Sequence, residues 1–543
     1  MDDNTNNTLK YFNEFIQIFK DPNGLKLDSY TAAGENRDDF TYWIERKLDN
    51  LGGIKGGSSY KFGIYKYKKK PEDRNGYMCD GTYAWVKKYG ETADEAFEYV
   101  KNRICNIYQL VCEENINYDK LGEVAKEDAY MWKIAFLYSN KRLVNVYKQE
   151  VLEVAAKRLG IEVNGEESIA SLQKSLMEYY NKNKKYYDND VIKFGSKVWN
   201  VGTTELLNCN QLIKYGAPGT GKTFTAKKDA EFLFENWKIE ANNQTANFSD
   251  SYEFVQFHPS YSYEDFIEGI KPVLVNGKTE LKLRNGIFKS FCKKSAKYEL
   301  WLLENGLIPE NKLEEITVKD VKEKIKNDNP CPFHFPDNAK DEDLICKYIP
   351  PYFFLIDEIN RADLSRVFGE LMYCLEYRGY SGRIKTQYSE MEQGDTIFYA
   401  EGDQHYFFIP ENVYIIGTMN TIDRSIESFD FALRRRFMWQ RVVPNENVLK
   451  EYFNEICEQN FVDKVINAWK TLNKEIESLL GEDYQIGHSY LMKLDKYSGY
   501  NETSYRKVIW EKHINPILEE YFRGSGNQGK EQIEKLSKKF FNN

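Results

Sequence analysis

The sequence has little of what would place it in several large classes of protein. Its nine cysteines form no C-x-x-C pair and its five histidines lack the spacing of metal ligands, so neither a disulfide scaffold nor a structural zinc site is expected. No run of about 18 or more apolar residues occurs, and the start MDDNTNNTLK lacks the features of a signal peptide. We therefore expect a cytoplasmic protein with no membrane segment.

The length of the chain limits the number of domains, and its charge limits the kind of surface that it can present. The 543 residues predict two to four domains, at roughly 100–200 residues for each. The chain has 75 Lys+Arg and 84 Asp+Glu, and the formal net charge of -9 argues against a uniformly basic nucleic-acid-binding surface. A local basic patch is compatible with this balance.

Changes of pattern divide the chain into four segments. Residues 1–160 mix helix and strand, and residues 161–205 are polar and predicted as a helical connector. Residues 206–442 alternate short apolar strands with helices, which is typical of a parallel α/β sheet. Residues 443–543 form amphipathic helices without strands. The predicted fold class is thus an α/β domain with a helical subdomain after it and an α+β domain before it.

Periodicity and turn residues predict the individual elements. Helical spacing predicts helices over 37–51, 128–138, 146–159 and 504–522, a helix after Thr92, and a buried face made by Phe461, Val465, Trp469, Leu472 and Ile476. Alternating or apolar runs predict strands over 58–67, 211–215, 253–258, 352–356 and 413–417, and a hairpin over 271–283 around Asn276-Gly277. Pro516 is expected to kink its helix. Residues 298–350 are predicted as an insertion over one face of the α/β domain.

A glycine-rich octet carries the strongest chemical signal. Gly216-Ala-Pro-Gly-Thr-Gly-Lys-Thr223 follows a predicted strand and opens a helix, which is the context that a phosphate-binding P-loop requires. Lys222 is expected to reach the β- and γ-phosphates, and the Thr223 hydroxyl to ligate Mg²⁺. The predicted nucleotide-binding residues are Gly216, Pro218, Gly219, Thr220, Gly221, Lys222 and Thr223.

Two other strands end on side chains that suit hydrolysis. Asp357 and Glu358 follow the apolar strand 352–356, and Asn420 follows the strand 413–417. Because ligands bind beyond the carboxyl ends of parallel strands, Asp357 is predicted to hold Mg²⁺ and Glu358 to activate the attacking water. The uncharged amide of Asn420 is suited to orient this water or the γ-phosphate.

Three consecutive arginines, Arg434 to Arg436, lie at the end of a predicted helix. Cations at a helix C-terminus often complement the helix dipole, which is the structural explanation. The functional alternative is an arginine finger, which stabilises the phosphoryl-transfer transition state and can be supplied by a neighbouring subunit. We favour a finger for at least one of the three.

With these motifs in this order, residues 206–540 resemble an AAA+ domain of the McrB-like family, the motor subunits of McrBC-type modification-dependent restriction systems. The matching phrases are QFHPSYSYEDFIEG at 256–269, LIDEINRADLSRVFGELMYCLE at 355–376, GTMNTIDRS at 417–425, FALRRRF at 431–437 and IGHSYL at 486–491. Asn420, Thr421 and Asp423 match the family's Asn-Thr-x-Asp signature.

The resemblance implies a nucleoside triphosphatase that uses GTP or ATP with Mg²⁺, and no residue distinguishes guanine from adenine. It implies contacts of Arg361, Arg435 and Arg436 across a subunit boundary in a homo-oligomeric ring, usually a hexamer. It also implies a separate McrC-like nuclease subunit, with Thr421 and Asp423 as residues that couple to it.

The resemblance leaves the N-terminal segment open. In such systems this segment recognises the target, so we expect DNA binding there within a restriction or phage-defence complex. Tyrosines interleaved with lysines around 60–70 could stack bases and follow phosphates. A strand whose solvated lysines prevent edge-to-edge pairing explains the same pattern at least as well.

Two other functions fit the same motor. A MoxR-like remodelling ATPase would grip protein instead of DNA, and a nucleotide-gated binding module would bind nucleotide with negligible turnover.

Overall fold

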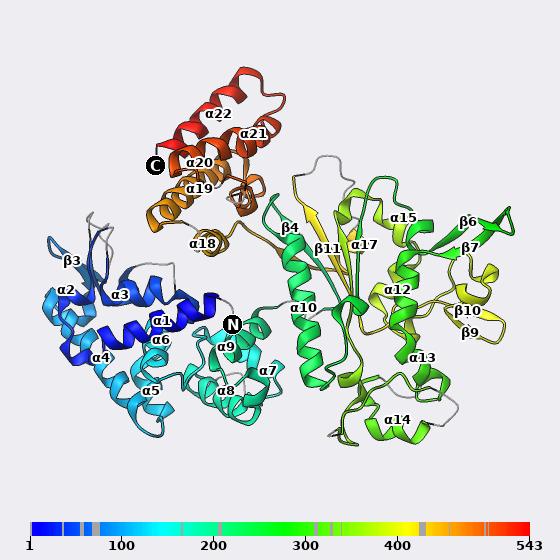
Figure 1. The fold of residues 1–543 in the computed structure, drawn as a ribbon, viewed down its shortest axis with the longest axis horizontal. Coiled ribbons are helices and arrows are strands. Elements are labelled where there is room, and N and C mark those ends of the chain that lie inside the picture. Colours follow the sequence, from blue (N-terminus) through cyan, green and yellow to red (C-terminus); the bar gives the residue numbers. More distant parts are fainter. Residues whose placement is uncertain are drawn as a thin grey trace. The chain divides into compact units, whose positions relative to one another are not determined.

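The computed structural model describes residues 3–34, 37–54, 59–67, 76–163, 167–204, 209–308, 313–325, 330–337, 339–422, 431–454, 457–493, 496–497 and 499–542 (Figure 1). The chain divides into two compact units, Met1–Thr204 and Glu205–Asn543. No helix in the described ranges is both long enough and apolar enough to cross a membrane.

The first unit is mainly helical and carries one small sheet. Its helices are α1 (Asp3–Ile18), α2 (Leu27–Tyr30), α3 (Phe40–Tyr42), α4 (Ala93–Cys112), α5 (Tyr118–Ala125), α6 (Ala129–Tyr138), α7 (Gln149–Arg158), α8 (Ile169–Asn183) and α9 (Val191–Thr203). Strands β1 (Ile64–Lys66), β2 (Tyr77–Cys79) and β3 (Tyr83–Val86) form an antiparallel sheet in the order β1-β3-β2. The segment predicted as a connector contains α8 and α9, which both pack against α7 within this unit.

Three helix predictions in this unit are confirmed by α4, α6 and α7. The N-terminus of α4 has a capping box, in which Thr92 Oγ1 accepts from the Glu95 N–H and the Glu95 side chain accepts from the Thr92 N–H. This pairing satisfies two of the backbone donors that a helix N-terminus leaves without partners.

Two other predictions in this unit are wrong in part. The single helix expected over 37–51 is divided into α3, a π-helical turn over Trp43–Lys47 and a 3-10 turn over Asp49–Leu51. The strand expected over 58–67 is limited to β1, because Ser59–Phe62 form a 3-10 helix and Gly63 turns the chain with φ 80°. That backbone conformation is readily available only to glycine, so the alternation does not run through it.

A five-stranded parallel sheet is the centre of the second unit. Its strands are β4 (Gln211–Gly216), β5 (Tyr252–Gln256), β8 (Tyr352–Asp357), β11 (Val413–Asn420) and β12 (Met438–Arg441), in the order β12-β4-β11-β8-β5. All neighbouring strands are parallel, so their carboxyl ends lie at one edge of the sheet. The four predicted strands are confirmed. Strand β12 was not predicted, because its sequence MWQR is short and half polar.

Helices and two small hairpins surround this sheet. The helices are α10 (Lys222–Glu240), α11 (Tyr263–Phe266), α12 (Ile287–Ser295), α13 (Lys297–Glu304), α14 (Val318–Lys324), α15 (Leu364–Phe368), α16 (Leu371–Glu376) and α17 (Phe431–Arg434). The hairpins are β6 (Glu268–Val275) with β7 (Lys278–Asn285) and β9 (Tyr399–Glu401) with β10 (Gln404–Tyr406).

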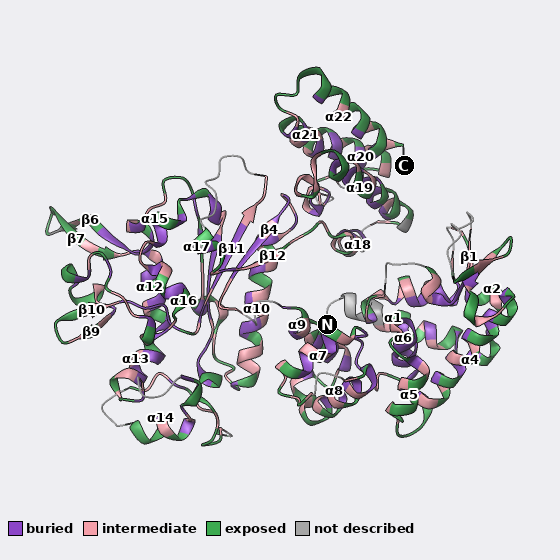
Figure 2. Cartoon of the chain, turned by 180° about the vertical axis from the view of Figure 1, so that it is seen from behind, coloured by how far each residue is buried: buried purple, intermediate pink, exposed green. Residues whose placement is uncertain are grey.

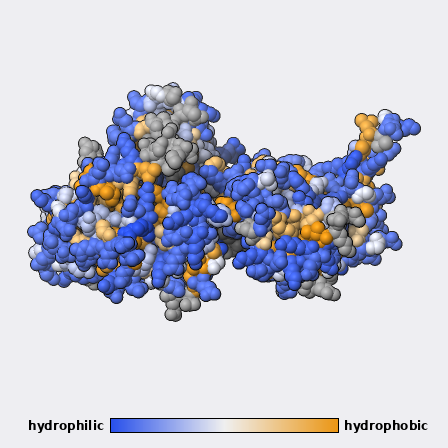
Figure 3. Space-filling model, turned by 60° about the horizontal axis from the view of Figure 1, so that its bottom comes forward, coloured by the Kyte–Doolittle hydropathy of each residue, from blue (hydrophilic) through white to orange (hydrophobic). Residues whose placement is uncertain are grey.

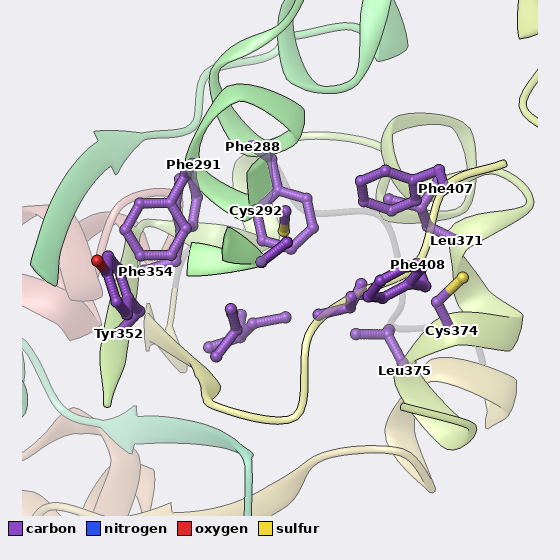
Figure 4. Close-up of a cluster of buried hydrophobic side chains, with 14 of the residues drawn as sticks. Phe288, Phe291, Cys292, Tyr352, Phe354, Leu371, Cys374, Leu375, Phe407 and Phe408 are labelled. Carbon is purple, nitrogen blue, oxygen red and sulfur yellow. The ribbon is translucent and has the colours of Figure 1, made fainter. Parts of the chain in front are cut away.

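The core of this unit is rich in aromatic rings. Phe288 and Phe291 of α12 pack around Phe354 of β8, with ring centroids 4.9 Å and 5.2 Å away, and Phe407 and Phe408 lie in the same cluster (Figure 4). Strands β4 and β11 are buried along most of their length (Figure 2). The predicted insertion over 298–350 contributes buried residues to this same cluster, among them Tyr298, Trp301, Leu313, Ile316, Val321 and Ile345.

The predicted hairpin over 271–283 is confirmed by β6 and β7. Asn276 and Gly277 form its turn with φ of 49° and 78°, as a two-residue hairpin turn of type I′ requires. Hydrophilic side chains cover most of the molecular face shown in Figure 3, and the hairpin is an exception to this rule because Leu274 and Leu281 are 77% and 73% exposed.

The last part of the second unit is helical, as predicted. It contains α18 (Glu446–Asn454), α19 (Gln459–Leu480), α20 (Glu502–Ile509), α21 (Asn515–Tyr521) and α22 (Gly526–Phe541). The predicted face of α19 is confirmed, since Val465, Trp469, Leu472 and Ile476 are buried in the core of this part and Phe461 packs against it. Pro516 lies in the first turn of α21, after a π-helical turn over Trp510–Ile514.

Candidate functional site

The predicted P-loop lies where strand β4 passes into helix α10. The strand ends at Gly216 and the helix begins at Lys222. Gly219 and Gly221 have φ of 74° and 78°, which L side chains rarely adopt, so the loop depends on these glycines. Thr220 Oγ1 donates to a carbonyl oxygen of the loop at 2.9 Å and closes it. This curved backbone at the N-terminus of a 19-residue helix is suited to bind phosphate.

Lys222 is buried and held by the loop itself. Its Nζ donates to the carbonyl oxygens of Gly216 at 3.0 Å and Ala217 at 2.7 Å. Burial lowers the pKa of Lys222 to about 8, and the nearby carboxylates of Glu358 and Asp357 oppose this shift. Lys222 is therefore held against the backbone of its own loop, and burial makes its positive charge easier to lose.

Asp357 meets two threonine hydroxyls at the carboxyl edge of the sheet. Thr223 Oγ1 donates to Asp357 Oδ1 at 2.8 Å, and Thr418 Oγ1 of β11 donates to the same oxygen. Carboxylate and hydroxyl oxygens suit Mg²⁺, which is commonly held by one or two carboxylates together with substrate phosphates. Thr223 and Asp357 therefore fit a Mg²⁺ ion. The sequence analysis did not predict Thr418 as a site residue. Its position two residues before Asn420, on the same strand, was the signal that could have identified it.

Glu358 and Asn420 face each other across neighbouring strands. Asn420 Nδ2 donates to Glu358 Oε1 at 2.6 Å, and Arg361 Nε lies 3.3 Å from Glu358 Oε2. Glu358 has φ 52°, an unusual conformation for a residue other than glycine and one that clusters at functional sites. The predicted general base is thus oriented by the predicted sensor amide and by an arginine of its own chain.

The two other candidate arginines lie at the opposite edge of the sheet. Arg435 and Arg436 precede β12, whose Met438 pairs with Leu212 near the start of β4. From Leu212 to the P-loop at the end of β4 is about 13 Å along the strand. Nη2 of both arginines lies near Glu376 Oε2, at 3.4 Å and 3.0 Å. These arginines are therefore not part of the same chain's phosphate site.

Of the two residues predicted to couple to a nuclease, Thr421 lies in the described part of the chain. The Thr421 N–H donates to the Gly216 carbonyl oxygen of the P-loop at 3.3 Å, and its buried Oγ1 has no hydrogen-bond partner among the described residues. Asp423 lies outside the described residues.

Two family models match the second unit. One, described as "AAA domain (dynein-related subfamily)", matches residues 211–437, and the other, described as "McrB, alpha-helical lid domain", matches residues 464–530. The Type IV methyl-directed restriction enzyme EcoKMcrB subunit of Escherichia coli (strain K12) is 34% identical over 319 residues, which cover 57% of this chain and 53% of that protein. This chain is an McrB-like AAA+ protein.

A second relative of the McrB-like chain is the Type II restriction enzyme BsuMI component YdiS of Bacillus subtilis (strain 168). It is 26% identical over 237 residues, which cover 42% of this chain and 56% of that protein. The McrB-like chain thus spans about half the length of both curated relatives. A solved structure from Cytophaga hutchinsonii covers 68% of this chain and 97% of its own at 13% identity, but its TM-score of 0.23 is too low to support any inference. The predicted AAA+ fold with a helical lid is confirmed by the family models and the sheet.

The lid of the McrB-like chain, helices α18–α22 and the segments between them, contacts the P-loop directly. The Gly487 N–H donates to Pro218 O at 3.2 Å, and the Ser489 N–H donates to Gly219 O at 3.0 Å. A Cβ added to Gly487 would lie 2.1 Å from the Gly219 carbonyl carbon, so the approach requires glycine. In the sequence, the glycine of IGHSYL at 486–491 is the one signal of this contact.

The low pKa of Lys222 predicts how nucleotide binding by the McrB-like chain depends on pH. With a pKa of about 8, the lysine is charged below pH 8 and becomes neutral above it. Phosphate binds the charged form, so affinity should be full near pH 7 and fall about tenfold by pH 9. Titration of fluorescent GTP and ATP analogues between pH 6.5 and pH 9.5 measures this. The variant Lys222→Met should bind weakly with no such slope, and a slope that persists in it would contradict the assignment.

Proposed function

We propose that this chain is a Mg²⁺-dependent motor that hydrolyses GTP or ATP within a DNA restriction complex of a phage-defence system. The observation that carries the proposal is the placement of three groups at one sheet edge: the P-loop, the Thr223–Asp357 pair and the Glu358–Asn420 pair. Together they supply a phosphate cradle, a metal site and an oriented general base, which hydrolysis of a terminal phosphate requires.

The position of each side chain supports one task in that reaction. The P-loop N–H groups and Lys222 bind the phosphates, and Thr223 and Asp357 hold Mg²⁺, which neutralises charge on the β- and γ-phosphate oxygens when bound. Glu358 accepts a proton from the attacking water. Asn420 keeps the Glu358 carboxylate turned towards the γ-phosphate position, and it does so without adding charge.

The proposed partners are a ring of identical subunits, a hexamer by resemblance, and an McrC-like nuclease subunit. The ring is supported by the distance between Arg435 and the P-loop of its own chain, since such an arginine can act only on a neighbouring nucleotide. The nuclease partner is supported by the two relatives, which are named as a subunit and a component of restriction enzymes. Thr421 and Asp423 are the proposed coupling residues.

Residues 1–160 are the proposed DNA-recognition domain, and the two matching family models lie outside this range. The ring of Tyr60 lies 3.8 Å from that of Tyr77 and 5.1 Å from that of Tyr65, centroid to centroid. Such grouped tyrosines beside the small sheet are a suitable platform for stacking bases. The lysines Lys68, Lys69 and Lys70 that the sequence places next to them lie outside the described residues.

Turnover of GTP and ATP, measured in parallel, tests the proposed function. The full chain is assayed alone, with the product of a neighbouring nuclease-subunit gene, and with that product plus methylated DNA. Mg²⁺-dependent hydrolysis that rises with the nuclease subunit is expected. Absence of hydrolysis in every combination would exclude the motor, and stimulation by a protein substrate but not by the nuclease would favour a MoxR-like remodelling ATPase.

A further inference from the structure

A buried group of three charged side chains links the β6–β7 hairpin to the segment that leads into the β9–β10 hairpin. The side chain of Lys289, on α12, is fully buried, and its Nζ lies 2.5 Å from Oε2 of Glu268, the first residue of β6. The same Nζ contacts Glu392 Oε1, and the Glu392 side chain is 1% exposed. Both hairpins extend from the same side of the second unit (Figure 1). We call Glu268, Lys289 and Glu392 the buried triad.

The charges of the buried triad do not balance. It has two carboxylates and one ammonium group, and burying an unbalanced charge is costly. In the part of the chain that the structure describes, Glu392 Oε2 is buried and has no hydrogen-bond partner. Burial raises the pKa of the Glu392 carboxyl, Lys289 opposes this shift and Glu268 adds to it. A further positive charge beside Glu392 Oε2 would therefore stabilise the triad.

His405 of β10 is placed to supply this charge. Its Nδ1 lies 3.7 Å from Glu392 Oε2 and 3.0 Å from the Ser389 carbonyl oxygen. Because a carbonyl oxygen only accepts, Nδ1 carries a hydrogen, and a proton taken up by the ring goes to Nε2. The side chain is 19% exposed, so solvent protons can reach the ring. The charged groups that face the ring are Glu392 and, beyond it, the other two members of the triad.

The β9–β10 hairpin depends on such contacts for its position. It is a sheet of two strands, and a two-stranded hairpin is only marginally stable without support from outside. Strand β10 packs against the turn over Ser389–Met391, to which His405 bonds. Histidine ordinarily changes its charge between about pH 5 and pH 8. The attraction of a charged His405 to the triad is therefore present at the acidic end of this range and is lost as pH rises.

We propose that His405 and the buried triad form a pH-dependent lock, in which the protonated His405 ring fixes the β9–β10 hairpin to the base of the β6–β7 hairpin. The lock closes as pH falls, because the closed form binds the additional proton more tightly than the open form. Asn285 Nδ2 and Lys293 Nζ hold the same segment without this proton, since both donate to the Asp395 carbonyl oxygen, at 3.2 Å and 2.7 Å. The lock thus strengthens an existing attachment, and it does not depend on nucleotide binding.

Amide hydrogen exchange of the full chain, corrected for the intrinsic pH dependence of exchange, tests the lock. In the wild type, protection of the β9 and β10 amides should be about tenfold higher at pH 6 than at pH 8, within the limit of about tenfold per pH unit that one proton sets. His405→Gln should show the low protection at both pH values. His405→Lys keeps its positive charge throughout this range and should show the high protection at both.

His334→Gln is the matched control, because His334 is exposed and lies in the segment over 298–350. This variant should keep the tenfold difference of the wild type. The proposal would be overturned by a wild type without a pH difference, by a difference that persists in His405→Gln, or by low protection of His405→Lys at pH 8. A difference that persists in His405→Gln would assign the proton to another group, and its loss in His334→Gln would show that the effect is not specific to His405.

Discussion

Replacing Glu358 with glutamine should lower the rate of nucleotide hydrolysis by about 100- to 10,000-fold, the range expected for loss of a general base. Nucleotide binding should survive, because the amide is nearly isosteric and Glu358 does not belong to the P-loop. The side-chain oxygen of glutamine can still accept the Asn420 Nδ2–H bond that the carboxylate accepts at 2.6 Å. Steady-state phosphate release and equilibrium binding of fluorescent nucleotide, measured on the same preparation, separate the two effects.

Asp363→Asn is a suitable control for the Glu358 variant. Asp363 lies five residues further along the same segment and caps α15 by accepting the Arg366 N–H at 3.2 Å. Asparagine is an equally good cap, so this loss of one negative charge should leave hydrolysis close to that of the wild type. Equal and slow turnover in the wild type and Glu358→Gln would instead indicate a nucleotide-gated binding module.

The sheet edge that carries the candidate site could be predicted from sequence because its parts are local. Each predicted strand is a short apolar run, and Asp357, Glu358 and Asn420 follow their predicted strands within three residues. Parallel pairing then brings these ends together without further information. The same locality explains the α4 prediction, since a capping box needs only residues three apart.

Contacts between distant segments could not be predicted in this way. The docking of Gly487 and Ser489 on the P-loop joins residues more than 250 positions apart, and nothing in the local pattern of IGHSYL indicates its partner. Strand β12 forms because the neighbouring β4 offers an edge for pairing, although its own sequence is half polar. Arg435 and Arg436 are equivalent in sequence, yet their side chains are 66% and 13% exposed. Only the packing of β12 distinguishes them.

Arg435 should therefore be the arginine that completes a neighbouring active site. Its exposed pair with Glu376, at 3.4 Å, is a surface ion pair of the kind that contributes little stability, so it can yield to a phosphate. Arg435→Ala should lower hydrolysis by the assembled protein about 10³- to 10⁵-fold, as loss of an arginine finger does. Arg434→Ala is the matched control, since this exposed arginine lies over the Trp439 ring, 5.1 Å from its centroid, and should leave the rate nearly unchanged.

A mixing experiment distinguishes action on a neighbouring subunit from damage to the same subunit. Arg435→Ala retains Glu358, and Glu358→Gln retains Arg435, so each variant lacks what the other supplies. If the arginine acts between subunits, a mixture of the two nearly inactive proteins should regain a measurable fraction of wild-type hydrolysis, because some Glu358 sites then face an intact Arg435. Were Arg435→Ala as active as the wild type, or the mixture no more active than its two components, Arg435 would not be the finger. The arginine cluster would then be explained by its position at a helix C-terminus, where cations complement the helix dipole.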